Sequence, residues 1–197
     1  MSFRIVDRRS SVLRHPVGRD RPRGKRPAGA IDAVVLHQMG FSRGANASAY
    51  DGVPAHFAVL PDGTVLHLHD ATTLLHASND RGIAVEFAGN FPNEQGRAWA
   101  AQRFGSHTPP REQIIAGRLL VMYLARVLGV RFVFAHRQAN AGRKPNCPGP
   151  HIWYNVGEWC VANLGLDDGG TGYAISSRTR KGAPIPNGWR DPRFELL

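Results

Sequence analysis

Short apolar runs bounded by turn residues are the feature that most limits the folds open to this chain. Residues 31–36 (IDAVVL), 83–87 (IAVEF) and 131–135 (RFVFA) are each five or six residues long and rich in β-branched or aromatic side chains. Runs of this length and composition predict buried strands. A hairpin is expected between residues 56–60 and 64–69, because Pro61-Asp62-Gly63 separates them and suits a tight turn.

Helical spacing appears later in the chain. Thr108 can cap a helix whose first turn begins at Pro109, apolar residues recur on one face through residue 128, and Gly129 is expected to end it. A second helix is expected at about residues 152–164, and residues 90–107 are expected to form a loop. The order of elements predicts an α/β (α+β) fold, a mixed central β-sheet flanked by helices.

Charge and composition divide the chain into three parts. Residues 1–30 form a basic N-terminal arm, residues 31–166 the folded domain and residues 167–197 a C-terminal extension that is either packed or mobile. The net charge is +10, of which residues 1–26 carry +7. Such an arm suits a polyanion such as an anionic cell wall, nucleic acid or lipid, and a solvated, partly disordered tail is the equal alternative.

Several classes of protein are disfavoured. No apolar run reaches the ~18 residues of a membrane span. The N-terminus lacks the apolar segment of a secretory signal, so we expect synthesis in the cytoplasm and another route of delivery if the target lies outside. Two cysteines make no disulfide scaffold, and Cys160 is expected to be a buried apolar residue of the last helix.

Two histidines and a cysteine fall where strands end. His37 follows one predicted strand, His136 follows another, and Cys147 lies in a Pro- and Gly-rich loop eleven residues later. If the two strands are neighbours, the imidazoles emerge at one edge of the sheet and the loop can bring the thiolate to them. Two His and one Cys leave a fourth position for water, as catalytic zinc requires, whereas structural zinc takes four protein ligands.

The chain resembles the zinc amidase family of type 2 N-acetylmuramoyl-L-alanine amidases, which shares its fold with peptidoglycan-recognition proteins. The matching segments occur in the family's order. They are residues 34–37 (VVLH), 55–59 (AHFAV) with 61–65 (PDGTV), 75–79 (LHASN), 83–87 (IAVEF), the helix at 108–128, 134–137 (FAHR) and 147–150 (CPGP).

This resemblance implies roles for individual residues. His37, His136 and Cys147 correspond to the zinc ligands, and the family places Asp or Cys at the third position. Glu86 corresponds to the strand carboxylate that acts as general base and then as proton donor. It also interrupts an apolar strand, where burial is costly without a function or a partner. The alternative is a Glu that faces the surface on an edge strand.

Lys144 is the expected stabiliser of the oxyanion. It departs from the family pattern, because the lysine often lies two residues before the third ligand and Pro145 stands there. Ala55 also departs from members that place a catalytic tyrosine before the His-Phe pair, which makes Glu86 more important.

Three further residues are expected to bind substrate. His56 and His76 match family positions, where they line the groove or orient ligands from behind, with a purely structural hydrogen bond as the alternative. Gln38 is expected to contact the stem peptide. His67 and His69 are expected on one polar sheet face and His151 at the groove rim, none of them as a ligand.

The function implied is hydrolysis of the amide bond between the N-acetylmuramoyl lactyl group and L-alanine of peptidoglycan, with zinc as cofactor. The alternatives are a non-catalytic peptidoglycan-binding module of the same fold, whose members typically lose a zinc ligand, and a nucleic-acid binder, for which the chain lacks a reading motif. Three biological roles fit: a phage endolysin, an injected antibacterial effector with an immunity or delivery partner, and a cytoplasmic muropeptide-recycling enzyme. We expect a monomer that acts on the cell wall.

Overall fold

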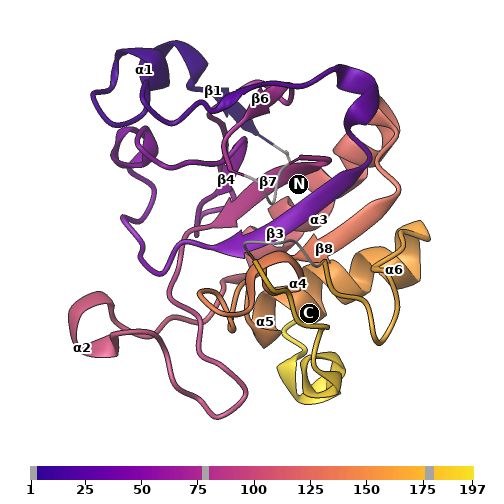
Figure 1. The fold of residues 1–197 in the computed structure, drawn as a ribbon. Helices are drawn as coiled ribbons and strands as arrows, with labels where there is room; N and C mark the ends of the chain where they lie inside the picture. Colours follow the sequence, from indigo (N-terminus) through magenta and orange to yellow (C-terminus); the bar gives the residue numbers. More distant parts are fainter. Residues whose placement is uncertain (1–3, 77–79, 176–179) are drawn as a thin grey trace.

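A six-stranded mixed sheet with the order β1-β5-β4-β7-β3-β8 forms the centre of the molecule (Figure 1). This computed structural model describes residues 4–76, 80–175 and 180–197. The strands of the sheet are β1 (Ile5–Asp7), β3 (Ala33–Gln38), β4 (Phe57–Val59), β5 (Val65–His67), β7 (Gly82–Phe87) and β8 (Phe132–Ala135). A separate two-stranded sheet pairs β2 (Gly24–Lys25) with β6 (Thr73–Leu74). The predicted fold class is confirmed.

The three predicted apolar strands are the neighbours β7, β3 and β8, and all of them run parallel. Their burial on both faces explains why their sequences are apolar throughout. The predicted hairpin is also confirmed, since β4 and β5 pair antiparallel, and β4 joins the parallel part through β7. These pairings place the carboxyl ends of β7, β3 and β8 at one edge of the sheet.

Helix α3 (Arg111–Leu128) covers one face of the sheet together with the last helical segment. Gly129 ends α3 with a positive φ of 68°, as expected. The helix begins three residues after Thr108, which does not cap it: Pro110 occupies the N-cap and no side chain caps there. The last segment begins two residues earlier than predicted and comprises α5 (Pro150–Ile152), a π-helical stretch (Trp153–Glu158) and α6 (Trp159–Leu164).

Shorter helices lie in the segments that connect the main strands and helices. They are α1 (Arg9–Arg14), α2 (Ala101–Phe104), α4 (Arg137–Asn140) and the 3-10 turns Ala28–Ala30, Ala47–Tyr50, Asn187–Arg190 and Pro192–Phe194. Helix α2 lies within the predicted loop at residues 90–107 and stands away from the sheet (Figure 1). No helix of the described part of the chain is both long and apolar enough to cross a bilayer.

Alternation along the strands divides the core between the two faces of the sheet. Leu36 and Phe87 pack in the large core with α3, whereas Ala84 belongs to a second core on the opposite face. That second core also contains Val12 and Tyr50, so the N-terminal segment covers part of the face that α3 leaves open. Cys160 is fully buried in the large core, which confirms its apolar role.

The expectation that residues 1–30 form a basic N-terminal arm outside the folded domain requires correction. Strand β1 pairs parallel with β5, and the Arg8 guanidinium donates to the Asp51 carboxylate with an Nε–Oδ1 distance of 3.0 Å. Arg26 is 7% exposed and donates to the carbonyls of Ala71 and Gly82. Because these contacts join residues far apart in sequence, no local periodicity could predict them. Part of the basic character of this segment therefore serves the fold.

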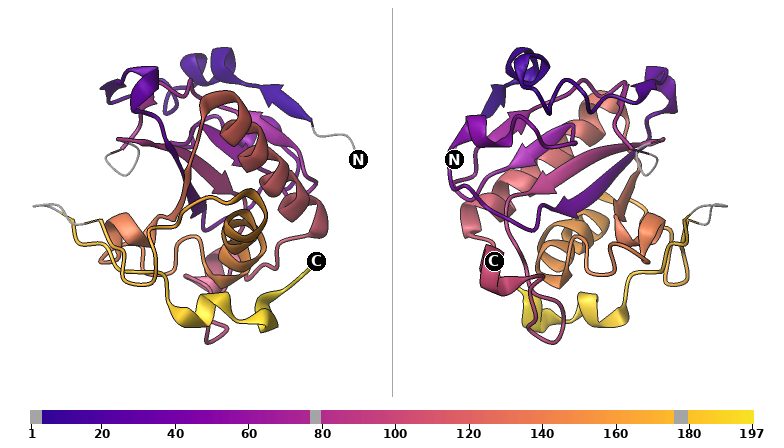
Figure 2. Two further views of the ribbon diagram at one scale, coloured as in Figure 1. Left: turned by 90° about the vertical axis from the view of Figure 1, so that its right-hand side faces the viewer. Right: turned by 60° about the vertical axis from the view of Figure 1, so that its left-hand side comes forward.

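The C-terminal extension is packed in its described part. Ile185 and Trp189 enter the large core, and Arg190 donates to the carboxylates of Glu158 and Asp168. In both views of Figure 2, helix α1 and the C-terminal turns lie at opposite ends of the molecule.

Candidate metal centre

The register of the parallel strands brings the predicted residues together. His37 of β3 pairs with Glu86 of β7, and Leu36 pairs with Ala135 of β8, directly before His136. The His136 backbone N–H donates to the Leu36 carbonyl at 3.1 Å, which continues that ladder. Because paired residues of parallel strands point to the same face, Glu86, His37 and His136 form one row at the carboxyl edge of the sheet.

The ligand atoms of His37, His136 and Cys147 converge. They all lie within 4.8 Å of one another, and the two histidine Nδ1 atoms are 2.9 Å apart. His37 is 1% exposed and Cys147 is 4% exposed. Among the residues that the structure describes, this is the one cluster of three His, Cys, Asp or Glu side chains placed to hold a metal ion.

The two imidazoles have the protonation state that metal binding requires. Burial, with neighbouring imidazoles and Lys144 adding to it, lowers the pKa of His37 well below its ordinary value and that of His136 to about 3. Both rings are therefore neutral at pH 7, the form that binds metal. Burial raises the pKa of Cys147, and a bound cation is what would favour the thiolate there. His37 Nε2 has no hydrogen-bond partner in the described chain, so this ring is not satisfied by protein alone.

Cys147 is held by backbone contacts on both sides. The Arg137 N–H donates to the Cys147 carbonyl at 3.0 Å, and the Cys147 N–H donates to the Lys144 carbonyl at 3.2 Å. The Gln38 backbone N–H donates to the Cys147 sulfur at 3.3 Å. These bonds fix the loop against the ends of β3 and β8, so the third donor is positioned before any ligand arrives.

The Gln38 side chain performs a task that the sequence did not reveal. Its Nε2 donates to the Asn146 carbonyl at 2.6 Å, and its Oε1 accepts from the Phe91 N–H at 2.7 Å. Gln38 is therefore a positioning residue that ties the Cys147 loop to residue 91. It also borders the clefts beside the metal centre, and its contact with the stem peptide stays a prediction.

Glu86 lies on an inner strand, which corrects the alternative of a surface residue on an edge strand. Its Oε1 is 3.8 Å from His37 Nδ1, its side chain is 14% exposed, and its Oε2 has no hydrogen-bond partner among the described residues. Burial raises the pKa of Glu86 to about 7, although the charge of Lys144 acts in the opposite direction. A carboxyl group poised in this way can both accept and donate a proton near neutral pH.

Lys144 stands beside the same centre. Its charge lowers the pKa values of His37, His136 and Glu86. Lys144 also borders two clefts that lie beside the centre. The departure from the family's lysine spacing has thus not removed the cation from the site. Its role toward an oxyanion stays a prediction.

His76 lies against the two candidate histidine ligands. Its ring centroid is 5.4 Å from that of His37 and 5.7 Å from that of His136, and burial lowers its pKa to about 4. His76 therefore lies beside the candidate centre, and its role toward substrate stays a prediction. The rest of its motif, residues 77–79, lies outside the described residues.

His56 is not a groove residue, which corrects the sequence prediction. It is fully buried, its Nε2 donates to the Thr73 carbonyl at 2.8 Å, and its Nδ1 accepts from the Ala84 N–H at 2.8 Å. Both ring nitrogens are thus used to join β7 to the segment around β6. In sequence, a histidine at a strand end is compatible both with a groove residue and with a structural hydrogen bond. Only the three-dimensional contacts distinguish these two interpretations.

The remaining predicted non-ligands lie elsewhere. His67 stacks on Phe57 with a centroid distance of 4.5 Å, and His151 meets Phe194 edge-on at 5.1 Å. His69 is 4% exposed, so the strand face that holds it is buried instead of open to solvent.

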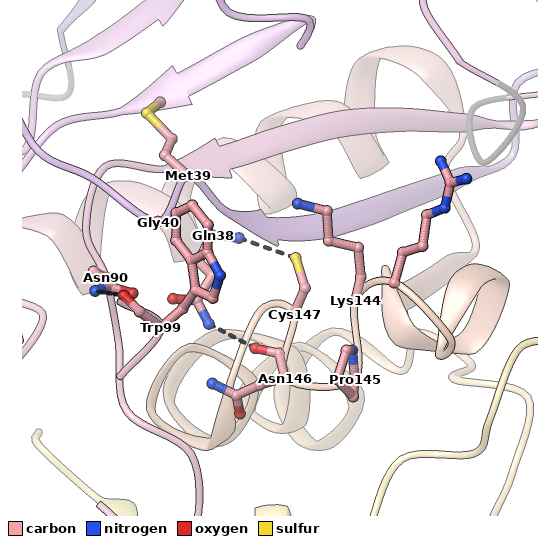
Figure 3. Close-up of a pocket in the computed structure, with 10 residues that line it drawn as sticks. Gln38, Met39, Gly40, Asn90, Trp99, Lys144, Pro145, Asn146 and Cys147 are labelled. Atoms are coloured by element: carbon pink, nitrogen blue, oxygen red, sulfur yellow. Dashed lines mark hydrogen bonds between the residues drawn. The ribbon is translucent and has the colours of Figure 1, made fainter. Parts of the chain in front are cut away.

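Two clefts lie beside the candidate metal centre. One, of about 240 Å³, is bordered by Trp99, Arg143 and Cys147 (Figure 3). The other, of about 410 Å³, is bordered by Glu86 and by Val17 and Arg21 of the N-terminal segment. Gln38, Met39 and Lys144 border both. Sequence reasoning missed Trp99, Val17 and Arg21, since no motif or periodicity marks them.

Comparisons with known proteins agree with this fold. A family model described as N-acetylmuramoyl-L-alanine amidase matches residues 27–150. Similar solved structures include the amidase LysC from Clostridium intestinale, with 17% identity over 84% of this chain and 100% of that chain and a TM-score of 0.55. The Drosophila peptidoglycan recognition protein SD is 16% identical over 84% of this chain and 98% of that chain, with a TM-score of 0.57.

The Ph2119 endolysin from a Thermus scotoductus bacteriophage is 19% identical over 74% of this chain and 92% of that chain, with a TM-score of 0.50. At these identities the likenesses establish a common fold. No curated protein sequence matches the chain.

The structural role of His56 predicts a pH-dependent stability. The hydrogen bond that Nδ1 accepts from the Ala84 N–H needs the neutral ring, and burial lowers the pKa of His56 from 6.5 to about 3. Below pH 6.5 the unfolded state binds a proton that the folded state does not, so the free energy of unfolding should fall as the pH drops from 6.5 toward 3. His56→Ala should lower this free energy by about 2–5 kcal/mol at pH 7 and weaken its pH dependence.

Urea unfolding at pH 7 and pH 5, in the presence of a chelator, measures both effects. Leu13→Ala, at an exposed and non-titratable position, is the control and should keep the wild-type pH dependence. A His56→Ala variant as stable as the wild type at pH 7 would contradict the role assigned to His56.

Proposed function

The chain belongs to the N-acetylmuramoyl-L-alanine amidase family, and from this membership we propose that it is a zinc-dependent hydrolase of peptidoglycan. The bond cleaved is the amide between the N-acetylmuramoyl lactyl group and L-alanine. One observation carries the proposal: two neutral imidazoles and a buried thiol converge beside a carboxyl group whose pKa is near 7. A metal hydrolase needs this combination of donors and proton carrier.

His37, His136 and Cys147 would hold the zinc ion. When bound, zinc supplies a Lewis acid that polarises a carbonyl group and makes water more acidic. The set of two nitrogens and one sulfur leaves room for a further ligand, as catalytic zinc sites do, whereas a structural site would be closed by a fourth protein ligand. The candidate cluster has no such fourth member within the described part of the chain.

Glu86 is the proton carrier of the proposed reaction. Its carboxylate takes a proton from the water molecule whose oxygen attacks the lactyl carbonyl carbon. When the carbon–nitrogen bond breaks, the same group returns the proton to the amine of L-alanine. A pKa of about 7 suits both steps, since neither form is strongly disfavoured at neutral pH.

Lys144 complements this proton transfer. Its ammonium group offsets the negative charge that grows on the carbonyl oxygen during attack. Gln38 keeps the Cys147 loop in place, and His76 packs against the rings of His37 and His136.

A binding module of the same fold is the second candidate. Peptidoglycan recognition proteins are among the similar structures, and one of these is the ectodomain complex of LCa and LCx with tracheal cytotoxin bound. The complete donor set together with the buried Glu86 favours the enzyme, because a module that only binds needs neither.

The biological setting follows from the substrate. We propose that the protein acts on peptidoglycan or its muropeptide fragments at the cell wall, as an endolysin or an antibacterial effector. The cytoplasmic recycling of muropeptides is the alternative, and soluble fragments as the preferred substrate would favour it.

Digestion of purified sacculi tests the proposed reaction. The zinc-loaded protein should release stem peptides with free L-alanine amino termini and leave the glycan strands intact. Incubation with a chelator should abolish release, and added zinc should restore it. Mass spectrometry of the products identifies the bond. Cleavage between sugars, between later stem residues, or at an undiminished rate after chelation would contradict the proposal.

Glu86→Gln tests the proton carrier separately from metal binding. The amide keeps the size of the side chain but cannot accept the proton, so kcat should fall about 10²-fold or more, while the zinc content stays at the wild-type level. Glu112→Gln, at an exposed position in the first turn of α3, is the matched control and should retain wild-type turnover. Wild-type kcat in Glu86→Gln would remove Glu86 from the mechanism.

A further inference from the structure

The cleft that ends at Trp99 has the character of a sugar-binding subsite. We infer that the Trp99 indole holds a hexosamine ring of the glycan strand, so that the glycan and the stem peptide leave the metal centre through different clefts. This inference rests on the proposed function and specifies how its substrate lies.

Trp99 is an unusually exposed aromatic side chain. It is 67% exposed, more than any other large apolar side chain in the described chain. Trp153 and Trp189 are by contrast buried in the core. Exposing an indole to water is unfavourable, so a large exposed aromatic beside a functional cleft indicates a binding surface.

The indole is also held in place, which separates it from a mobile surface residue. Its ring stacks on Phe104 of α2 with a centroid distance of 4.9 Å, and the Asn90 amide donates to the Trp99 carbonyl at 2.6 Å. A Cβ atom at Gly40 would lie 3.2 Å from the indole, so a glycine at this position lets the ring approach the end of β3. A platform fixed in this way loses little entropy when a ligand stacks on it.

The other groups of the cleft suit a carbohydrate. Figure 3 shows Trp99 beside Gln38 and Gly40, with Asn146, Cys147 and Lys144 farther along the same cleft. Exposed Arg143 and Lys144 also border this cleft, so its wall offers N–H donors for hydroxyl or carbonyl oxygens. A pyranose ring offers an apolar C–H face to the indole and polar groups around its rim, which matches this combination.

The two clefts match the two halves of the substrate. The scissile bond joins a sugar to a peptide, so the substrate must extend from the metal centre in two directions. The second cleft is bordered by Val17, Phe41 and Arg21, an apolar and cationic set that suits a stem peptide with carboxylate groups. The Trp99 cleft then remains for the glycan. Cys147 borders the Trp99 cleft, and Glu86 borders the second cleft.

Binding and turnover of the full chain test the inference together. The probe for binding is an N-acetylglucosamine oligomer, titrated by isothermal titration calorimetry, a readout that does not depend on the Trp99 indole. The wild type should show a saturable change, and Trp99→Ala should abolish it, whereas Trp99→Phe should keep most of the affinity. On sacculi, Trp99→Ala should lower kcat/KM about tenfold, mostly through KM, which corresponds to the loss of one stacked ring.

Matched controls separate this effect from misfolding. Tyr123→Ala removes an aromatic ring that is 43% exposed on α3 and borders neither cleft, so it should behave as the wild type in both assays. Circular dichroism and zinc content should be unchanged in Trp99→Ala and Trp99→Phe. Recovery of function in Trp99→Phe but not in Trp99→Ala is the pattern that an aromatic platform requires.

The outcomes distinguish this inference from the proposed function. Trp99-dependent sugar binding without any hydrolysis would overturn the proposed reaction and support the subsite. Hydrolysis at the wild-type rate by Trp99→Ala, with no saturable binding of the oligomer by the wild type, would overturn the subsite and leave the reaction standing. A Trp99→Ala defect that is equally large on a lactyl-peptide substrate without sugar would assign the cleft to the peptide and overturn the inference.

Discussion

The parallel register of β7, β3 and β8 is the constraint on which the rest of the structure depends. It aligns Glu86, His37 and His136 in one row at the carboxyl edge of the sheet, on the face that α3 does not cover. Because side chains alternate along a strand, a slip of one residue in β3 would turn His37 into the large core. The apolar residues before each of these three side chains fix the register, so the fold and the site are specified by the same strands.

Burial gives this row its chemistry. The imidazoles are kept neutral, the thiol is kept from ionising without a cation, and the pKa of Glu86 is raised to about 7. Each effect has desolvation as its largest cause, and each would be a cost to stability without a ligand or a reaction to use it. The loop that carries Cys147 is fixed through Gln38, so the neighbours of the three donors matter as much as the donors themselves.

The sequence predicted the features whose signals are local and missed those that depend on distant contacts. Apolar runs, the Pro-Asp-Gly turn and Gly129 located the main strands and the end of α3, and strand-end positions with a family resemblance located His37, His136 and Cys147. His56 was assigned wrongly, because its two backbone partners lie 17 and 28 residues away. The sequence also failed to predict the folded N-terminal segment, because its pairing with β5 leaves no pattern along the chain. It failed to predict the role of Trp99 because exposure beside a cleft leaves no such pattern either.

The coordination of bound zinc tests the central claim most directly. X-ray absorption at the zinc edge of the purified protein should report one zinc per chain with two nitrogen ligands at about 2.0–2.1 Å, one sulfur at about 2.3 Å and one further light atom. Substitution of Cys147 by Ser should remove the sulfur signal. A zinc environment without sulfur, or one closed by four protein ligands, would contradict the open site on which the proposed hydrolysis rests.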